Sequence, residues 1–282
     1  MINHKLTDLA CESYEQDKEK NPENGIISSL YDINEYSIIE TNITNKIGEE
    51  LTGRKIGKYL TLYSKNVWKY TEFEQKSVSL ALSFCIKKSM KNFCLSKPSF
   101  LVVGLGNRQI SADALGPMCI DKMTPTHHLK SNKNLYDAFG YDLSLIAPQV
   151  LGQSGIESSE IVKNAIKSIN PACLILIDSL STSSLDRLCS TFQVTNTGLT
   201  PASAIKEGRG EISSEKMGVP VISIGVPTAI SLDALARFFK SENSSFSNID
   251  CKDFLSPKDI DIILPTHSKI IADAITNVIK SM

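Results

Sequence analysis

The sequence contains few aromatic residues and almost no excess of one charge, and both shortages argue against a nucleic-acid partner. Aromatic residues make up 7% of the 282 positions, with one tryptophan, whereas proteins that bind single strands stack the bases on aromatic rings. Lysines and arginines number 30 and aspartates and glutamates 31, which gives a net charge of −1 and no basic face. We therefore expect no direct contact with nucleic acid.

Metal-ligating residues are scarce as well. The sequence has four histidines and seven cysteines, and no two cysteines stand in C-x-x-C spacing, so no zinc-ligand set is present. We expect no metal and no cofactor. We also expect the cysteines to be reduced and mostly buried, as in a cytoplasmic protein; they are Cys11, Cys85, Cys94, Cys119, Cys173, Cys189 and Cys251.

Long apolar runs are missing too. No stretch approaches the about 18 apolar residues of a membrane-spanning helix, and the first eight residues lack the apolar segment of a secretory signal. These features predict a cytoplasmic protein without a membrane partner. Hydrophobic residues nevertheless make up 41% of the chain, which is enough for the core of one large α/β domain or for two small domains.

The chain divides into a polar beginning and an apolar remainder. Residues 1–35 are polar and charged, which predicts a mobile arm or an irregular segment. Alternation within residues 36–63 predicts short peripheral strands. Apolar residues then recur three and four positions apart over residues 71–90, which predicts an amphipathic helix. The Ser- and Asn-rich residues 240–253 predict a loop.

Continuous apolar strands alternate with helix-like segments in the remainder of the chain. This pattern is typical of a parallel sheet that is covered on both faces. It predicts a three-layer α/β fold with a mostly parallel sheet and helices on both faces. The expected strands are 100–104, 142–147, 173–177 and 219–225, and the expected helices are 114–123, 158–169 and 257–280, the last one broken or kinked at Pro265.

A Gly-x-Gly turn follows the first of these strands, at Gly104 and Gly106. A dinucleotide fingerprint would need a third glycine, but position 109 is Gln. The glycines are better explained by a tight turn. The stretch Gly152-Gln153-Ser154-Gly155 is not a nucleophile elbow either, because Ile156 stands where that motif needs glycine and no histidine is placed to act as base. A cysteine nucleophile lacks a partner histidine in the same way.

Two aspartates stand beyond the ends of two predicted strands. Asp113 follows the Gly-x-Gly turn, and Asp178 directly follows the strand 173–177. Either residue can simply cap a helix or turn. However, the carboxyl edge of a parallel sheet is where α/β folds place their ligands. Two carboxyl groups in one site share a proton, so that one activates water while the other stabilises an oxyanion and protonates a leaving amine.

At these residues the sequence resembles the germination proteases of spore-forming Firmicutes, which are aspartic-type endopeptidases. The resemblance runs from Thr7 to the C-terminus with one large gap. Its blocks occur in one order, which makes them more specific than any single motif. They are residues 7–10, 102–107, 113–117, 155–160, 177–180, 197–198, 218–228 and 256–258.

This resemblance implies a set of functional residues. The two essential aspartates of the family fall on Asp113 and Asp178. The family is made as a zymogen that removes its own propeptide, and the site of that cut matches Asp8–Leu9. Residues 1–8 would then be a propeptide and residues 9–282 a single α/β peptidase domain. An acidic residue, an apolar residue and Ala10 also resemble the motif that these proteases cut in their substrates.

The resemblance further implies partners and a compartment. The substrates would be small acid-soluble spore proteins, degraded during germination in the spore core, which is a cytoplasmic compartment. The chain would also act on itself and assemble as a homo-oligomer, a tetramer in the family. The core of the fold is expected to be similar to that of hydrogenase maturation endopeptidases.

Three departures from the family pattern leave alternatives open. Residues 196–204 replace an acid, a histidine and two glycines, Ser231 replaces an acid, and a segment before residue 255 is largely missing. One alternative is a diverged, non-catalytic paralogue that binds spore proteins. Another is a metal-assisted maturation peptidase, for which His127 or His128 would read the metal.

Overall fold

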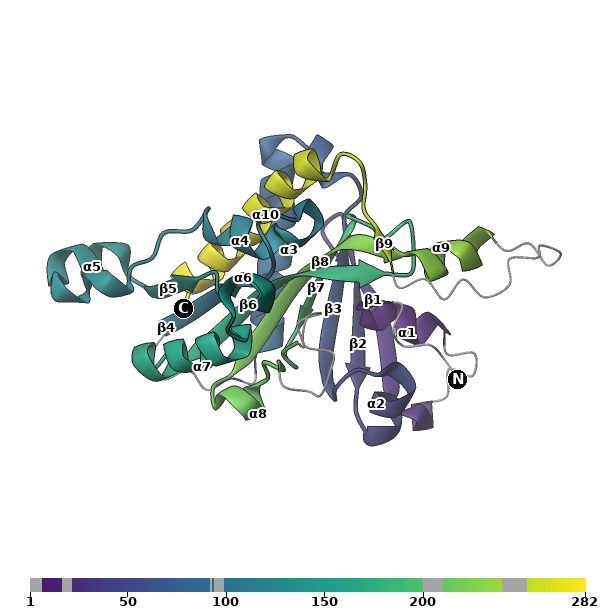
Figure 1. Ribbon diagram of the computed structural model, residues 1–282, viewed down its shortest axis with the longest axis horizontal. Coiled ribbons are helices and arrows are strands. Elements are labelled where there is room, and N and C mark those ends of the chain that lie inside the picture. Colours follow the sequence, from purple (N-terminus) through teal and green to yellow (C-terminus); the bar gives the residue numbers. More distant parts are fainter. Residues whose placement is uncertain (1–6, 17–21, 92, 94–98, 200–209, 240–252) are drawn as a thin grey trace.

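A nine-stranded sheet runs through the computed structural model, which describes residues 7–16, 22–91, 93, 99–199, 210–239 and 253–282 (Figure 1). The strand order is β1-β2-β3-β7-β8-β6-β4-β5, and β9 pairs with β8. The predicted loop at 240–253 lies outside the described residues except for Asp253. The strands are β1 (Ile26–Ile33), β2 (Tyr36–Ile43), β3 (Gly57–Tyr63), β4 (Ser99–Gly104), β5 (Asp142–Ile146), β6 (Cys173–Thr182), β7 (Thr191–Thr195), β8 (Val221–Ser231) and β9 (Phe254–Leu255).

One half of the sheet is parallel. Strands β5, β4, β6 and β8 pair in parallel, with Gly104 opposite Ile177 and Asp178 opposite Gly225. The middle strands are apolar on both faces because helices cover both sides, so their side chains read as continuous hydrophobic runs. The predicted α/β class with helices on both faces of its central sheet is confirmed.

The other half of the sheet is antiparallel. Strands β1, β2, β3 and β7 form consecutive antiparallel pairs, and β7 joins this half to β8. Residues 36–63 supply β2 and β3, whereas β1 and β7 were not among the predicted strands. A two-residue connection between β1 and β2 makes a hairpin, with Asn34 in the left-handed region (φ 54°).

Helices cover the two faces in distinct groups. Side chains of α3, α4 and α10 share one apolar cluster with β2, β3, β4, β6, β7 and β8, and α7 packs on the opposite face of β4 and β6 (Figure 1). No helix among the described residues is long and apolar enough to cross a membrane. The helices are α1 (Ala10–Gln16), α2 (Lys46–Thr52), α3 (Glu72–Met90), α4 (Leu115–Ile120), α5 (Lys133–Phe139), α6 (Leu151–Ser154), α7 (Ser158–Ile169), α8 (Ser214–Met217), α9 (Leu232–Phe239) and α10 (Ile260–Lys280).

The two longest helices follow from sequence signals of different kinds. Helix α3 begins at a capping box, in which the Thr71 hydroxyl accepts from the Glu74 N–H and the Glu74 carboxylate accepts from the Thr71 N–H. Helix α10 continues through Pro265, so of the break or kink expected there, the break is wrong. Its flanking residues Ile263, Leu264 and His267 are buried against the core, which offsets the loss of one backbone hydrogen bond.

The predicted mobile arm at residues 1–35 is also wrong where the structure describes it. Helix α1 packs on β2 and β3, where Ala10 contacts Ile43 and Tyr59, and residues 26–33 form strand β1. Leu9, Ala10 and Cys11 are buried. Two of its polar residues, Glu12 and Glu15, form ion pairs with Arg187, as described below.

The turn after β4 passes very close to β6. A methyl group on Gly104 would lie 2.2 Å from the carbonyl oxygen of Gly116, and one on Gly116 would lie 2.7 Å from the carbonyl oxygen of Ile177. The Leu105 N–H donates to that same Ile177 carbonyl at 2.8 Å. These two glycines therefore bring the residues between β4 and α4 against the carboxyl-terminal part of β6.

We expect Gly104→Ala to lower the free energy of unfolding by about 3 kcal/mol, because rigid backbone stands where the added methyl group would go. Chemical denaturation measures this difference. Gly152→Ala is the matched control: a methyl group there meets nothing within 4 Å, so we expect a change of about 1 kcal/mol or less. Equal effects of the two substitutions would contradict the packing argument.

Candidate active site

Asp113 lies in a short 3-10 helix, Ser111–Asp113, between β4 and α4. Its carboxylate accepts a hydrogen bond from the Asn107 N–H at 2.9 Å. The Thr228 hydroxyl holds the same helix by donating to the Ala112 carbonyl at 2.6 Å. The capping alternative fails here, because Ala114 is the N-cap residue of α4 and has no side-chain cap bond.

Asp178 lies within β6, which continues to Thr182 beyond the end predicted for this strand. Its carboxylate accepts from the N–H of Ser179 at 2.9 Å, so it does not cap a helix. Side chains alternate along the strand, so Asp178 faces the same side as Leu176, which packs with Val162 of α7. Across the sheet, Asp178 is the register partner of Gly225.

Burial raises the pKa of both carboxyl groups. It raises the pKa of Asp113 to about 6, against a smaller lowering by the Asn107 N–H. Burial also raises the pKa of Asp178 well above its ordinary value, and the nearby charge of Asp113 raises it further. The two predicted residues thus lie close enough for their charges to interact. The charge of each carboxylate disfavours ionisation of the other, so this arrangement disfavours the state in which both are ionised.

Asn107 holds the loop that carries Asp113. Its side-chain carbonyl accepts from the Gln109 N–H at 2.9 Å and from Nε2 of Gln153 at 2.7 Å. Gly106 adopts φ 115°, and a methyl group there would lie 2.1 Å from the Asp113 carbonyl oxygen. The glycine of this turn is therefore required both by its backbone angle and by the close approach of Asp113.

Residues 7–9 lie against the end of β6 beside Asp178. The Asp8 N–H donates to the Ser181 carbonyl at 2.8 Å, and the Asp8 carboxylate accepts from both the N–H and the hydroxyl of Ser181 at 2.8 Å. Arg54 donates to the Thr7 carbonyl and lies 3.3 Å from the Asp8 carboxylate. The charge of Asp8 also contributes to the raised pKa of Asp178. The predicted cleavage residues and Asp178 therefore share one site.

The side-chain amide of Gln193 binds the chain on both sides of Leu9. Its Nε2 donates to the Asp8 carbonyl oxygen at 3.0 Å, and its Oε1 accepts from the Ala10 N–H at 2.9 Å. Gln193 and Asp178 are both register partners of Gly225, from β7 and β6. The Asp8–Leu9 peptide bond is thus fixed on the same part of the sheet as Asp178.

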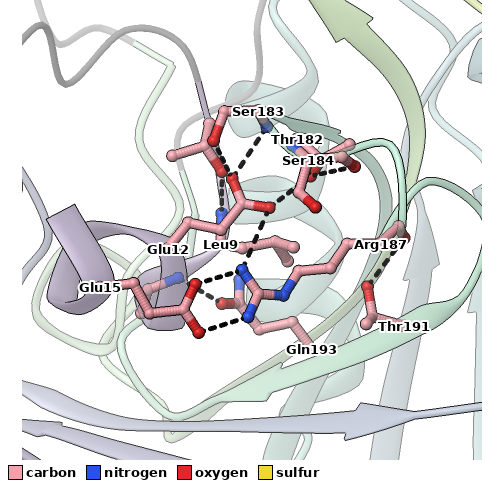
Figure 2. A network of polar contacts seen from close by, with 11 residues as sticks. Leu9, Glu12, Glu15, Thr182, Ser183, Ser184, Arg187, Thr191 and Gln193 are labelled. Atoms are coloured by element: carbon pink, nitrogen blue, oxygen red, sulfur yellow. Dashed lines mark hydrogen bonds and ion pairs between the residues drawn. The ribbon is translucent and has the colours of Figure 1, made fainter. Parts of the chain in front are cut away.

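Helix α1 continues this contact through two glutamates (Figure 2). The Glu12 carboxylate accepts from the Thr182 hydroxyl at 2.5 Å and from the N–H and hydroxyl of Ser183 at 2.8 and 2.5 Å. Arg187 lies 3.6 Å from Glu12 and forms a two-pronged ion pair with Glu15 at 2.5 and 2.8 Å. Together these bonds fasten the N-terminal segment to the loop after β6.

The other residues considered for catalysis or metal binding, Ser154, His127 and His128, are not part of this site. The Ser154 hydroxyl donates to the carbonyl groups of Val150 and Ile156 and so closes the end of α6. His127 lies 2.8 Å from Asp142 at the amino end of β5, the opposite edge of the sheet, and His128 is exposed. No group of three metal-ligating side chains occurs among the residues that the structure describes.

Five of the seven cysteines belong to the described residues, and all five are free and buried, as expected; they are Cys11, Cys85, Cys119, Cys173 and Cys189.

The substituted stretch 196–204 is described up to residue 199. Its Asn196 accepts from the Lys58 N–H at 2.9 Å, and its Thr197 hydroxyl lies 3.1 Å from that of Tyr59. These residues tie β7 to β3. The Ser231 hydroxyl accepts from the Ala234 N–H at 3.1 Å and caps α9.

Sequence reasoning missed the residues that hold the N-terminal segment. Ser181, Gln193 and Arg187 carry no motif, and their roles depend on contacts more than 170 residues away along the chain. Asn107 had a signal, since it follows the Gly-x-Gly turn directly. Gln153 belonged to a stretch considered only as a nucleophile elbow, and its contact with Asn107 had no local signature.

The family model and the curated relatives that match this sequence agree on one family. A family model described as germination protease matches residues 4–237. A germination protease of Clostridium acetobutylicum is 32% identical over 97% of this chain and 94% of its own length. A germination protease of Bacillus subtilis is 37% identical over 70% of this chain and 54% of its own length. Among solved structures, a [NiFe] hydrogenase maturation protease from Thermococcus kodakarensis, 13% identical, matches 68% of this chain and 98% of its own with a TM-score of 0.38.

We expect Asp178→Asn to raise the free energy of unfolding at pH 7 by about 1 to 3 kcal/mol, because it removes a buried carboxyl group beside a like charge. Because the pKa of Asp178 is higher in the folded state than in the unfolded state, the unfolded state loses this proton first as pH rises above about 4. The stability of the unmodified chain is therefore full below about pH 4 and is lost as pH rises through the folded-state pKa of Asp178. The advantage of the variant should therefore vanish near pH 4. Denaturation at several pH values measures it.

Asp186→Asn serves as the control for this series. Its side chain is 84% exposed, so we expect little difference from the unmodified chain at any pH. An Asp178→Asn variant whose advantage stays constant between pH 4 and pH 7 would show that the carboxyl group is not the cause.

Proposed function

Because this chain belongs to the germination protease family, we propose that it is an endopeptidase that degrades small acid-soluble spore proteins during spore germination. The proposal includes the spore core as its compartment and a homo-oligomer, such as the tetramer expected from the resemblance, as its assembly. It also includes an aspartate pair, Asp113 and Asp178, as the catalytic groups. The raised pKa values of these neighbouring carboxyl groups support that assignment.

The chemistry follows from the two protonation states. The ionised Asp113 takes a proton from water as the water oxygen attacks the peptide carbonyl carbon. The protonated Asp178 donates a hydrogen bond to the developing oxyanion. When the C–N bond breaks, a proton passes from the pair to the leaving amine, and the products are a carboxylic acid and a free amine.

The observation that carries the proposal is the position of the Asp8–Leu9 bond. The Asp8 backbone and carboxylate are bound at Ser181, and Gln193 donates to the Asp8 carbonyl oxygen, on the strands that flank Gly225. A chain made as a zymogen that cuts itself at this bond would need such an arrangement. Cleavage would free residues 1–8 and leave Leu9 as the new N-terminus.

We expect the purified chain to convert to a form that begins at Leu9, and we expect Asp113→Asn and Asp178→Asn to remain at full mass. Intact-mass spectrometry over time gives both results. The same variants should fail to cut a purified small acid-soluble spore protein, with rates at least about 1,000-fold lower, because the pair acts as one unit. Asp137→Asn, at an exposed residue of α5 away from this site, should process and cut as the unmodified chain does.

Two outcomes would change the proposal. Cutting by either aspartate variant at the unmodified rate would remove the pair from the mechanism. Tight binding of the spore protein by the unmodified chain without any turnover would favour the diverged, non-catalytic paralogue.

Gln193 gives an independent test of how the bond is held. We expect Gln193→Glu to slow the conversion to the Leu9 form about 100-fold, because the amide N–H that bonds the Asp8 carbonyl oxygen is lost and a charge is added. Gln75→Glu is the matched control, since Nε2 of Gln75 also donates to a backbone carbonyl, that of Tyr70, at 2.9 Å on α3. Equal conversion by both variants would indicate that the Gln193 contact has no part in the cut.

A further inference from the structure

Helix α3 carries apolar side chains on two opposite faces. One face packs on the sheet and on α10, and its Val78, Leu82 and Ile86 belong to the main core (Figure 1). A helix that covers a sheet usually has a single apolar stripe, with polar side chains on its outer face. The second apolar face of α3 is therefore not explained by the packing of this chain on itself.

Three exposed apolar residues make up this second face. Phe73 is 83% exposed, Leu80 is 53% exposed and Phe84 is 43% exposed. At 3.6 residues per turn, spacings of seven and four positions place the three side chains within about 40° of one another around the helix axis, opposite Leu82. They form a continuous stripe about 16 Å long, the α3 stripe. A continuous exposed apolar surface of this kind is typical of an interaction site.

Strand β1 continues the surface beside the Phe84 end of the α3 stripe. The Lys88 ammonium group lies 4.3 Å from the centre of the Tyr31 ring on β1 and 6.0 Å from that of the Phe84 ring. Lys88 is held there by an ion pair of 2.6 Å with the buried Glu40. The rim of the stripe is thus already ordered, which lowers the entropy cost of binding a partner.

The charges on α3 have opposite signs at its two ends. Glu72 and Glu74 lie in the first turn, whereas Lys87 and Lys88 lie in the last turn. Two such helices attract each other when they are antiparallel, because the acidic end of each lies beside the basic end of the other, whereas a parallel pair brings like charges together. A twofold axis perpendicular to α3 gives the antiparallel arrangement and joins the same surface on both molecules. The charge pattern therefore favours a second copy of this chain as the partner.

The order of side chains along the α3 stripe fits the same arrangement. An antiparallel pair can be centred between Ser77 and Leu80. Phe73 of one copy then lies beside Phe84 of the other, and the small side chain of Ser77 faces the larger one of Leu80, as in interlocking helix surfaces. The Ser77 hydroxyl donates to the Glu35 carboxylate at 3.4 Å, so its burial does not leave it without a hydrogen bond.

We propose that the α3 stripe is a contact between two copies of this chain, related by a twofold axis that makes their α3 helices antiparallel. The inference rests on the homo-oligomer that the proposed function includes, and it gives one interface of that assembly a position. Asp178 faces the α7 side of the sheet, whereas α3 covers the other side. Pairing through α3 would therefore leave the Asp178 side chain uncovered.

Leu80→Glu tests the α3 stripe. We expect the unmodified full-length chain to be a dimer or a larger assembly, and we expect the variant to raise the Kd of this contact at least about 100-fold, because a charge enters the centre of the stripe from both copies. Sedimentation equilibrium over a range of concentrations measures this Kd. A tetramer built with this contact should fall to half its mass or less.

Leu135→Glu is the matched control. It makes the same substitution at a side chain that is 49% exposed, on α5 at the other end of the sheet (Figure 1), so the mass of the assembly should not change. Circular dichroism shows whether each variant is folded. Phe84→Ser replaces Leu80→Glu if the latter does not fold, and it should raise the Kd about tenfold.

Charge reversal tests the antiparallel arrangement. We expect Glu72→Lys and Lys87→Glu each to raise the Kd about tenfold, because each places like charges at both ends of the pair. The double variant should restore the Kd of the unmodified chain. That restoration cannot arise within one chain, because the two residues are 15 positions apart on the helix, about 22 Å.

The outcomes separate this inference from the proposed function. If folded Leu80→Glu keeps the mass of the unmodified assembly, or if the double reversal does not restore the Kd, the α3 contact is overturned and the homo-oligomer stands. A chain that is monomeric at every concentration overturns both the α3 contact and the homo-oligomer. Cutting of the spore protein decides the endopeptidase activity separately.

Discussion

The close approach of the turn after β4 to strand β6 is the constraint on which the site depends. Gly104 and Gly116 have no side chains at the points where backbone meets backbone, and the Leu105 N–H bonds directly to the Ile177 carbonyl. Asp113 is thereby placed beside Asp178, although 64 residues of helix, strand and loop lie between them in the sequence. The raised pKa values are a consequence of this packing, since burial raises both and the charge of Asp113 raises that of Asp178 further.

The antiparallel half of the sheet gives the N-terminal segment its place. Strands β2 and β3 turn Ile38 and Leu60 toward α3 and turn Ile43 and Tyr59 toward α1, as expected for alternating side chains. Gln193 alternates with Phe192 and Val194 on β7 and therefore faces α1 as well. One face of this antiparallel half completes the main core, and the other binds the N-terminal segment, whose Asp8 also contacts Ser181 of β6, the strand that carries Asp178.

The part of this architecture that can be predicted from the sequence is the part whose signals are local. Apolar runs identify β4, β6 and β8, a capping box marks the start of α3, and the two aspartates stand out because each follows such a run. Strand β7 is short and belongs to a polar stretch, and α1 has few apolar residues, so neither has a clear pattern. Their stability comes from partners such as Ser183, which lies 171 residues from Glu12, and no local rule contains that information.

The loop at Arg187, which hydrogen bonds hold to the core, has a consequence for how binding would be measured. If this loop is already folded, a peptide substrate that binds where α1 lies does not have to reshape it. The peptide only needs a molecule in which α1 has undocked. Its apparent affinity is then the intrinsic affinity multiplied by the undocked fraction. Two preparations with identical sites would therefore differ in apparent affinity whenever temperature, salt or a truncated N-terminus shifts that fraction. Salt would screen the ion pair of the exposed Glu15 carboxylate more than that of the buried Glu12 carboxylate.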